Sequence, residues 1–237
     1  DISVKNRDGE TWDFGWNAGA YYTYAPFGTQ IGVGYHSKVD ITAEGHSRVT
    51  DAIGIEFTGD AETDLIYPGF FNVSLVQKID DCWSILADIR WTNWNKVDKN
   101  VIKIKGAAAT ALAANGINPT TNLELDWRDS INYAVGVAYK HSDKWKFKAG
   151  IGYDETPVPS NEKRPYLIPD NDRYIGAFGA QYCINQNLHL DASYNAKVLP
   201  AARIHATEVA PPIELNSDAR VNTWINEFSV AITWTIA

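Results

Sequence analysis

The feature that most constrains this chain is an alternation of apolar and polar residues with a period of two. Between residues 188 and 198 every even-numbered position is apolar and every odd-numbered position is polar. Successive side chains of a β-strand point to opposite faces, so this period predicts strands with one apolar and one polar face. The pattern recurs and predicts nine strands, at residues 11–24, 31–44, 70–79, 83–97, 126–140, 144–154, 174–184, 188–198 and 222–236. A short helix is expected only at 107–114, and all ten prolines fall outside the predicted strands.

The connections between these strands fall into two classes that alternate along the chain. The short turns are expected at residues 25–28, 80–82, 141–143 and 185–187, and the long loops at 45–69, 98–125, 155–173 and 199–221. Short turns at one end of a sheet and long loops at the other are typical of an outer-membrane β-barrel. The sequence therefore predicts an all-β fold, a transmembrane antiparallel β-barrel, with residues 1–237 forming a single domain.

A soluble β-sandwich would also alternate, and strand length separates the two folds. Soluble strands average about 5 to 6 residues, whereas these reach the roughly 9 to 11 that a tilted strand needs to cross a bilayer. Aromatic residues recur at both ends of the apolar faces, as in Trp145 and Tyr153 or Trp224 and Trp234, which suits interfacial girdles. No apolar run approaches the roughly 18 residues of a membrane helix.

Charge and residue spacing argue against several other functions. The net charge of −8 and the absence of a basic stripe disfavour nucleic-acid binding. The five histidines lack metal-ligand spacing, so neither a metal nor a cofactor is expected. His189, Asp191 and Ser193 have the residue types of a hydrolase triad, but same-face neighbours on a strand lie roughly 6.5 to 7 Å apart, too far for catalysis. The chain is therefore not expected to be an enzyme.

Cys82 and Cys183 are expected to be free thiols three strands apart.

Nine strands are an odd number, whereas single-chain bacterial barrels have an even one. An open sheet edge would leave unpaired backbone groups in hydrocarbon, at high cost. We therefore expect the chain to be the C-terminal part of a larger barrel. The missing strands would lie on a separate fragment or on a segment outside this sequence.

Several motifs, in order along the chain, resemble those of the FadL and TodX family of outer-membrane transporters. They are WDFGWNAG (12–19), YHSKV (35–39), ADIRWTNWNKV (87–97), WRDSINYAVGVAY (127–139), and GIGYDETPVP followed by IPDNDR (150–159 and 168–173). The resemblance implies a fourteen-stranded barrel plugged by an N-terminal hatch, of which this chain holds the last nine strands. It implies a location in the bacterial outer membrane, in contact with its lipid, and passive uptake of long-chain fatty acids or of aromatic or aliphatic hydrocarbons.

Two other functions remain open at this stage. The chain could belong to a general hydrophilic porin, or to a structural or phage-receptor barrel whose function lies in its loops. Within the transporter hypothesis, Ile53, Ile55 and Phe57 are expected to form part of an external apolar groove that captures ligand.

Four cations, Lys38, Arg90, Lys146 and Lys148, fall on faces that should point into the lumen. A fatty-acid carboxylate in an apolar lumen needs a cationic partner. We expect Arg90 to be that partner, with Leu86 and Trp94 beside it as apolar neighbours, and Lys148 to contribute. The alternative is that the four cations pair with Asp40, Asp88, Glu227 or water.

The loop 155–173 and its flanks combine prolines with a dense set of charges. We expect it to be a rigid lid segment at the mouth of the barrel, held by ion pairs. The residues of the expected network are Asp154, Glu155, Arg164, Asp170, Asp172 and Arg173.

Overall fold

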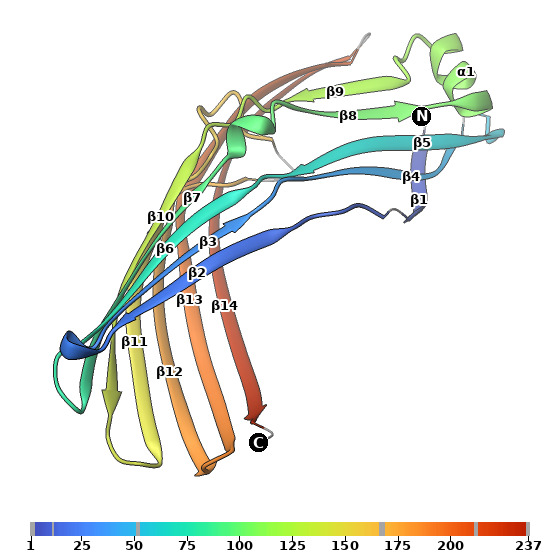
Figure 1. Cartoon of the computed structure of the whole chain (residues 1–237). Helices are drawn as coiled ribbons and strands as arrows, with labels where there is room; N and C mark the ends of the chain where they lie inside the picture. The colour runs from blue at the N-terminus through green and yellow to red at the C-terminus, as the bar shows by residue number, and fades with distance from the viewer. Residues whose placement is uncertain (1–2, 11, 51–52, 166–168, 211–212, 236–237) are drawn as a thin grey trace.

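The computed structural model describes residues 3–10, 12–50, 53–165, 169–210 and 213–235 of the chain. Almost all of its regular structure is antiparallel β-sheet, arranged as two sheets that meet end to end (Figure 1). No helix among the described residues is long and apolar enough to cross a membrane.

The larger sheet has nine strands within the described residues, as the sequence predicted. Its order is β14-β13-β12-β11-β10-β7-β6-β3-β2, with every neighbouring pair antiparallel. The sheet curves as a section of a barrel wall (Figure 1). Its strands are β2 (Asn17–Tyr24), β3 (Thr29–His36), β6 (Phe70–Lys78), β7 (Trp83–Thr92), β10 (Ser130–Lys140), β11 (Trp145–Asp154), β12 (Arg173–Asn185), β13 (Leu188–Ala210) and β14 (Ile213–Trp234).

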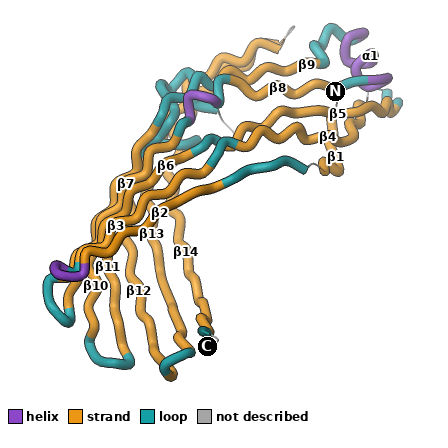
Figure 2. The backbone as a smooth tube through the Cα atoms, viewed as in Figure 1, coloured by secondary structure: helices purple, strands orange, loops and turns teal. Residues whose placement is uncertain are grey.

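Short connections join these strands at one end of the larger sheet, as Figure 2 shows. The first contains a 3-10 helix, η1 (Ala25–Phe27), closed by Gly28 at φ 61°. Glycine adopts this left-handed conformation at no steric cost, which a tight turn of this kind requires. The opposite end carries the long excursions and is therefore the external end of an outer-membrane sheet.

A second, five-stranded sheet forms where the sequence predicted only long loops. Its order is β1-β4-β5-β8-β9, and a helix, α1, follows β8. The expectation that 45–69 and 98–125 are loops is therefore wrong, whereas the short helix was predicted correctly. The elements are β1 (Ser3–Glu10), β4 (Val39–Thr50), β5 (Glu56–Tyr67), β8 (Lys99–Ile104), α1 (Gly106–Ala114) and β9 (Thr120–Glu124).

Two further expectations about strands are corrected. The predicted strand 31–44 is divided between β3 of the larger sheet and β4 of the smaller one. The predicted loop 199–221 is mostly strand, because β13 and β14 continue as a paired hairpin well past the rest of the larger sheet. Pro200 consequently lies inside β13, at an irregularity between Leu199 and Ala202. A bulge is where a strand tolerates a proline, since the missing N–H is not needed there.

Aromatic rings gather in two bands on the apolar face of the larger sheet. Near the short turns, Trp83 lies 4.6 Å from Tyr139, and Trp145 lies 4.8 Å from Tyr182, between ring centroids. Towards the external end, Tyr153 and Tyr174 lie 5.3 Å apart. Exposed aliphatic side chains such as Ile89, Val135 and Ile151 occupy the same sheet. Two aromatic bands that flank an aliphatic zone are the pattern of a membrane-facing surface.

Candidate lumenal site and its surroundings

The register of the larger sheet identifies the face opposite to the membrane-facing one. Residues directly opposite each other in an antiparallel pair share a face, so rows of side chains can be followed across the sheet. One row begins with Gln30 and ends with Asn195 and Glu227, all polar. Because barrels alternate apolar-out and polar-in, this polar face is the lumenal face. The middle of this row is apolar and consists of Val76, Leu86, Gly136, Gly150 and Ala177.

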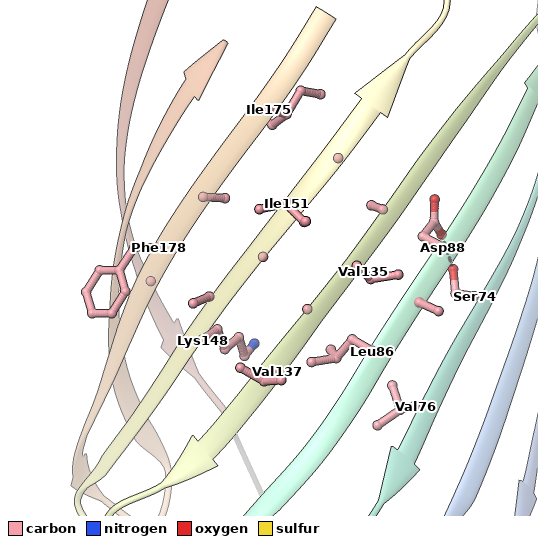
Figure 3. A pocket seen from close by; sticks show the side chains of 18 of the residues that line it. Ser74, Val76, Leu86, Asp88, Val135, Val137, Lys148, Ile151, Ile175 and Phe178 are labelled. Atoms are coloured by element: carbon pink, nitrogen blue, oxygen red, sulfur yellow. Dashed lines mark hydrogen bonds between the residues drawn. The ribbon is translucent and has the colours of Figure 1, made fainter. Parts of the chain in front are cut away.

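This apolar middle forms a hollow of about 480 Å³ on β6, β7, β10, β11 and β12 (Figure 3). Small residues make room for it. A Cβ atom at Gly136 would come within 2.8 Å of the Ala149 carbonyl oxygen, and one at Gly150 within 3.0 Å of the Val135 oxygen. The backbones of β10 and β11 thus approach too closely for side chains at these two positions, and their glycines leave the lumenal face open.

Polar groups lie at the borders of the hollow. Lys148, from β11, lines it on the side of the short turns, and forms no ion pair with any described residue. Asp88, from β7, lines it further towards the external end and accepts a hydrogen bond from the Ser74 hydroxyl. The hollow therefore offers an apolar surface with a cation at one border and a satisfied carboxylate at another. Leu86 and Lys148, both predicted as ligand-binding residues, meet here.

Arg90 lies on the same lumenal face but not in this hollow. It belongs to the row of Asn72, Asn132 and Asp154, one step beyond Asp88 towards the external end. Its guanidinium carbon lies 5.0 Å from the centroid of the Phe70 ring, within range of a cation–π interaction. Arg90 thus has an aromatic neighbour, Phe70, that the sequence did not predict.

The expectation that Trp94 shares the strand face of Arg90 and Leu86 is wrong. β7 ends at Thr92, and Trp94 begins a 3-10 helix, η2 (Trp94–Lys96). Its ring packs edge-on against Trp127 at 5.1 Å, beside a small core that contains Val97, Leu125 and Val158. Trp94 is therefore part of the packing that joins the external loops.

Of the other cations expected in the lumen, Lys38 pairs with Asp40 at 2.5 Å, as the alternative interpretation held. Glu227 pairs with Lys197 at 3.0 Å and not with one of the four expected cations. Lys146 lies opposite Gln181 near the short turns.

The three residues predicted for an external groove lie in two different settings. Ile53 and Ile55, in the connection between β4 and β5, are 81% and 50% exposed. Phe57, on β5, packs against the α1 cluster that contains Ala108 and Leu112. It also lines a hollow of about 340 Å³ with residues of α1. The structure thus brings Phe57 together with α1.

The loop that connects β11 and β12 is held by charged groups at its base. Arg173 pairs with Asp154 and, at 2.6 Å, with Asp170. Asp172 accepts hydrogen bonds from the Tyr153 hydroxyl at 2.6 Å and from the Thr156 N–H at 2.9 Å. These contacts fix the two chain segments of the loop to each other where they leave the sheet.

Arg164 anchors the same loop to the extended hairpin of β13 and β14. Its side chain is only 6% exposed and donates hydrogen bonds to the carbonyl oxygens of Asp170 and Arg203 and to the side chain of Asn161. Burial lowers the pKa of the Arg164 guanidinium, against the opposing effect of Asp170. Glu155 accepts a hydrogen bond from the Ile131 N–H at 3.2 Å on β10.

The two cysteines are free, as predicted. Cys82 is exposed in the turn before β7. Cys183 lies 3.2 Å from Nδ1 of His189, on the neighbouring strand.

Sequence reasoning missed the small residues that shape the lumenal hollow and the hydroxyl groups that complete the loop network. The first had a signal, since glycines in a strand interior mark a close approach of backbones, and Gly136, Gly150 and Gly152 all stand on the polar face. Thr156 and Tyr153 had no comparable signal, because their partners lie on the far side of the loop.

The chain matches the model of the family described as outer membrane protein transport protein (OMPP1/FadL/TodX) over residues 2–234. It is 24% identical to a long-chain fatty acid transport protein of Escherichia coli, over 95% of this chain and 50% of that protein. A FadL homologue of Pseudomonas aeruginosa has a similar fold, with a TM-score of 0.80 and 24% identity, over 93% of this chain and 52% of the other.

The toluene transporter TodX of Pseudomonas putida also shares the fold, with a TM-score of 0.67 and 16% identity, over 94% of this chain and 50% of that one. The chain spans about half the length of the curated relatives it matches. The family match nevertheless covers nearly all of the chain, and the strand pattern, the aromatic bands and the two-faced sheet agree with it. The chain therefore belongs to the OMPP1/FadL/TodX family of outer-membrane transport proteins and is part of an outer-membrane β-barrel.

Proposed function

We propose that this chain forms part of a channel for the passive uptake of hydrophobic compounds across the outer membrane. The substrate class is long-chain fatty acids or aromatic or aliphatic hydrocarbons; one relative is named a long-chain fatty acid transport protein and another a toluene transporter. No chemical step is involved. The compound would be captured in an external apolar groove, pass to the lumenal hollow, and leave by a path that a hatch outside this sequence controls.

The observation that carries the proposal is the apolar hollow on the lumenal face. Water-filled barrels have a polar interior, and the lumenal row that contains Leu86 has polar side chains towards both of its ends. The middle of the face nevertheless exposes Val76, Leu86, Ile175 and Ala177 around a volume of about 480 Å³. Ligand pockets of this size are mostly apolar with a few placed polar groups. This arrangement favours a hydrophobic substrate over a hydrated solute.

Lys148 gives the hollow a selective element. A fatty acid that lies with its tail on Val76 and Leu86 could place its carboxylate at the Lys148 ammonium group, which no described carboxylate neutralises. Arg90, one row beyond Asp88, would meet the carboxylate at an earlier stage of transit. The two cations would thus act in succession along the lumenal face.

At the external end, we propose that Ile53, Ile55 and Phe57 contribute to the capture groove, supported by the hollow between Phe57 and α1. The loop network around Arg173 would keep the mouth in a fixed shape.

We further propose that the two sheets form one domain, because β3 leads directly into β4 and η2 leads into β8.

The outermost strands of the larger sheet, β14 and β2, each pair on one side only within the described residues. Open strand edges are not tolerated in hydrocarbon. We propose that further strands, on another fragment or on a segment outside this sequence, pair with both edges, and that outer-membrane lipid covers the apolar face.

The proposal is tested with the protein purified from outer membranes and inserted in planar bilayers and liposomes. We expect liposomes to take up a radiolabelled long-chain fatty acid or toluene, with no open-channel conductance of porin size. A large steady conductance together with indifference to hydrophobic solutes would contradict the proposal and favour a general hydrophilic porin.

Replacing Lys148 with Met tests the selective element. We expect fatty-acid binding to weaken by about tenfold, which corresponds to about 1.4 kcal/mol, because the carboxylate loses its partner in an apolar site. Binding of toluene, which has no charge, should stay unchanged. The measurement is equilibrium binding of both labelled compounds to the purified protein. Equal losses for both would mean that Lys148 matters for structure and not for the carboxylate.

Replacing Arg90 with Ala tests the earlier position. Fatty-acid uptake should fall, whereas uptake of toluene should not. The matched control is Lys197→Met, which removes a lumenal cation that Glu227 already neutralises. Unchanged fatty-acid uptake in the Arg90 variant would remove this residue from the pathway.

A further inference from the structure

Two arginines face each other on the external extension of the β13–β14 hairpin. Arg203 on β13 lies directly opposite Arg220 on β14, and both side chains are exposed. Like charges at directly opposed positions of a sheet destabilise it. An anion between or above the two guanidinium groups would remove this cost.

The register shows which way these side chains point. Trp224 and Phe228, exposed at 70% and 80%, mark the membrane-facing side of β14. Arg220 precedes Trp224 by four residues and therefore shares its side. The irregularity between Leu199 and Ala202 brings Arg203 onto the same side and turns Ala202 and Ile204, both buried, to the other. Both guanidinium groups thus point outward, beyond the external end of the apolar face.

Their height relative to the membrane follows from the strand geometry. Four residues of strand span about 13 Å at roughly 3.3 Å per residue, so Arg220 lies about that far along the strand beyond Trp224, which marks the interface. Side chains at this level face the headgroups of the surrounding lipid and not its hydrocarbon. In an outer membrane, the external leaflet is made largely of glycolipid that carries phosphate groups.

The charged residues around Arg203 and Arg220 leave both guanidinium groups available to bind an anion. Among the residues whose side chains the structure describes, no carboxylate forms an ion pair with Arg203 or Arg220. Asp218 lies one step further along the same side, opposite His205. Asp218 thus lies on the same side as the two arginines without forming an ion pair with either of them.

The backbone of β13 at this site is held in place by the loop between β11 and β12. The Arg203 carbonyl oxygen accepts a hydrogen bond from the buried Arg164, and the His205 N–H donates to the Asn161 carbonyl oxygen at 3.0 Å. The two arginines therefore project from a fixed platform, which lowers the entropy lost when an anion binds.

We propose that Arg203 and Arg220 bind a phosphate group of a phosphorylated glycolipid in the outer leaflet beside the barrel. Guanidinium groups suit this ligand, because each presents a planar fork of N–H donors that matches two phosphate oxygens. The site would fix a lipid against the wall of the barrel at the external rim. It depends on the outer-membrane location and not on the compound that the channel carries.

The test compares lipid binding by the protein purified from outer membranes and stripped of lipid. Bisphosphorylated lipid A is titrated in detergent and the bound lipid is counted by native mass spectrometry. The double variant Arg203→Gln/Arg220→Gln should bind it at least about tenfold more weakly than the natural protein. Lipid A from which the phosphates have been removed should bind both proteins equally and weakly.

The matched control removes two other cations of the external region, as Arg48→Gln/Lys103→Gln. These pair with Glu56 and Glu62 on the five-stranded sheet and should leave lipid A binding unchanged. If the glutamine variant fails to fold, Arg203→Lys/Arg220→Lys keeps both charges but loses the forks, and should lose part of the affinity. The proposal would be overturned if the variants at Arg203 and Arg220 bound lipid A as tightly as the natural protein. It would also be overturned if the control variant lost as much affinity, or if dephosphorylated lipid A bound the natural protein as tightly as lipid A does.

Discussion

Replacing Ala177 with Trp is expected to reduce uptake of hydrophobic compounds by about tenfold or more while the barrel still folds. Ala177 stands in the middle of the lumenal row, opposite Gly150, and lines the hollow. An indole ring there would occupy much of the space that the small residues of β10 to β12 leave open, and transit depends on that space. The expected result is a loss of both fatty-acid and toluene uptake, since the ring excludes either tail.

The measurement is uptake of both labelled compounds into liposomes that contain the protein purified from outer membranes. The matched control is Ala192→Trp on β13, which lies opposite Val230 on the membrane-facing side, where an added indole meets lipid. It should transport at the natural rate. If the Ala177 variant folds and still transports both compounds normally, the hollow is not on the pathway, and the proposed function loses its main support.

Replacing Arg173 with Ala is expected to release the loop between β11 and β12. The guanidinium group bridges Asp154 and Asp170, and the Asp170 side chain is only 8% exposed. Removing the Arg173 guanidinium group leaves the Asp154 and Asp170 carboxylates close together in a partly desolvated site, which destabilises the loop by about 3 kcal/mol. This change destabilises mainly the closed state of the loop, because the strands of the sheet keep their backbone hydrogen bonds. We expect the loop to open and to be cleaved by protease in intact outer membranes.

The control for this change is Lys163→Ala, which removes from the same loop a partly exposed cation whose carboxylate partners are exposed. Lys163 pairs with Asp126 at 2.6 Å and with Glu124 at 3.3 Å, and exposed pairs contribute less than about 1 kcal/mol. Cleavage of this variant should stay near the natural rate. The double variant Arg173→Ala/Asp154→Asn lacks one of the two carboxylates that repel each other, so part of the protection against protease should return. Full protection of the Arg173 variant would show that the prolines and the Arg164 contacts hold the loop without Arg173.

The strands of the barrel wall and their two faces could be predicted because the signal is local. In a spanning strand one side meets hydrocarbon and the other meets the lumen, so apolar and polar residues alternate over much of its length. Each strand can therefore be predicted without knowledge of its partners. The stretch 188–198 is the clearest case. The odd number of strands and the direction of the external end followed from the same pattern together with the lengths of the connections.

Most of the external sheet lacked such a signal, apart from residues 39–44 of β4, which the sequence predicted as strand. β4 and β5 project beyond the membrane, where both faces contact water or other loops, and polar residues such as His46, Ser47 and Asp60 interrupt any apolar side. Their identity as strands rests on pairing with each other and with β1 and β8. The same holds for the hairpin beyond Leu199, whose continuation past Pro200 depends on a bulge.

The sequence by itself determined the number of spanning strands, which side of each strand meets lipid, and the presence of a charged, proline-rich loop between two of them. Only the tertiary structure decided what those residues meet. It placed Leu86 and Lys148 around one hollow and moved Trp94 out of it, set Arg203 opposite Arg220, and tied Arg164 to β13. These outcomes depend on register and on contacts between segments far apart in the chain. A one-residue shift in pairing would change every one of them without altering the alternation from which the strands were predicted.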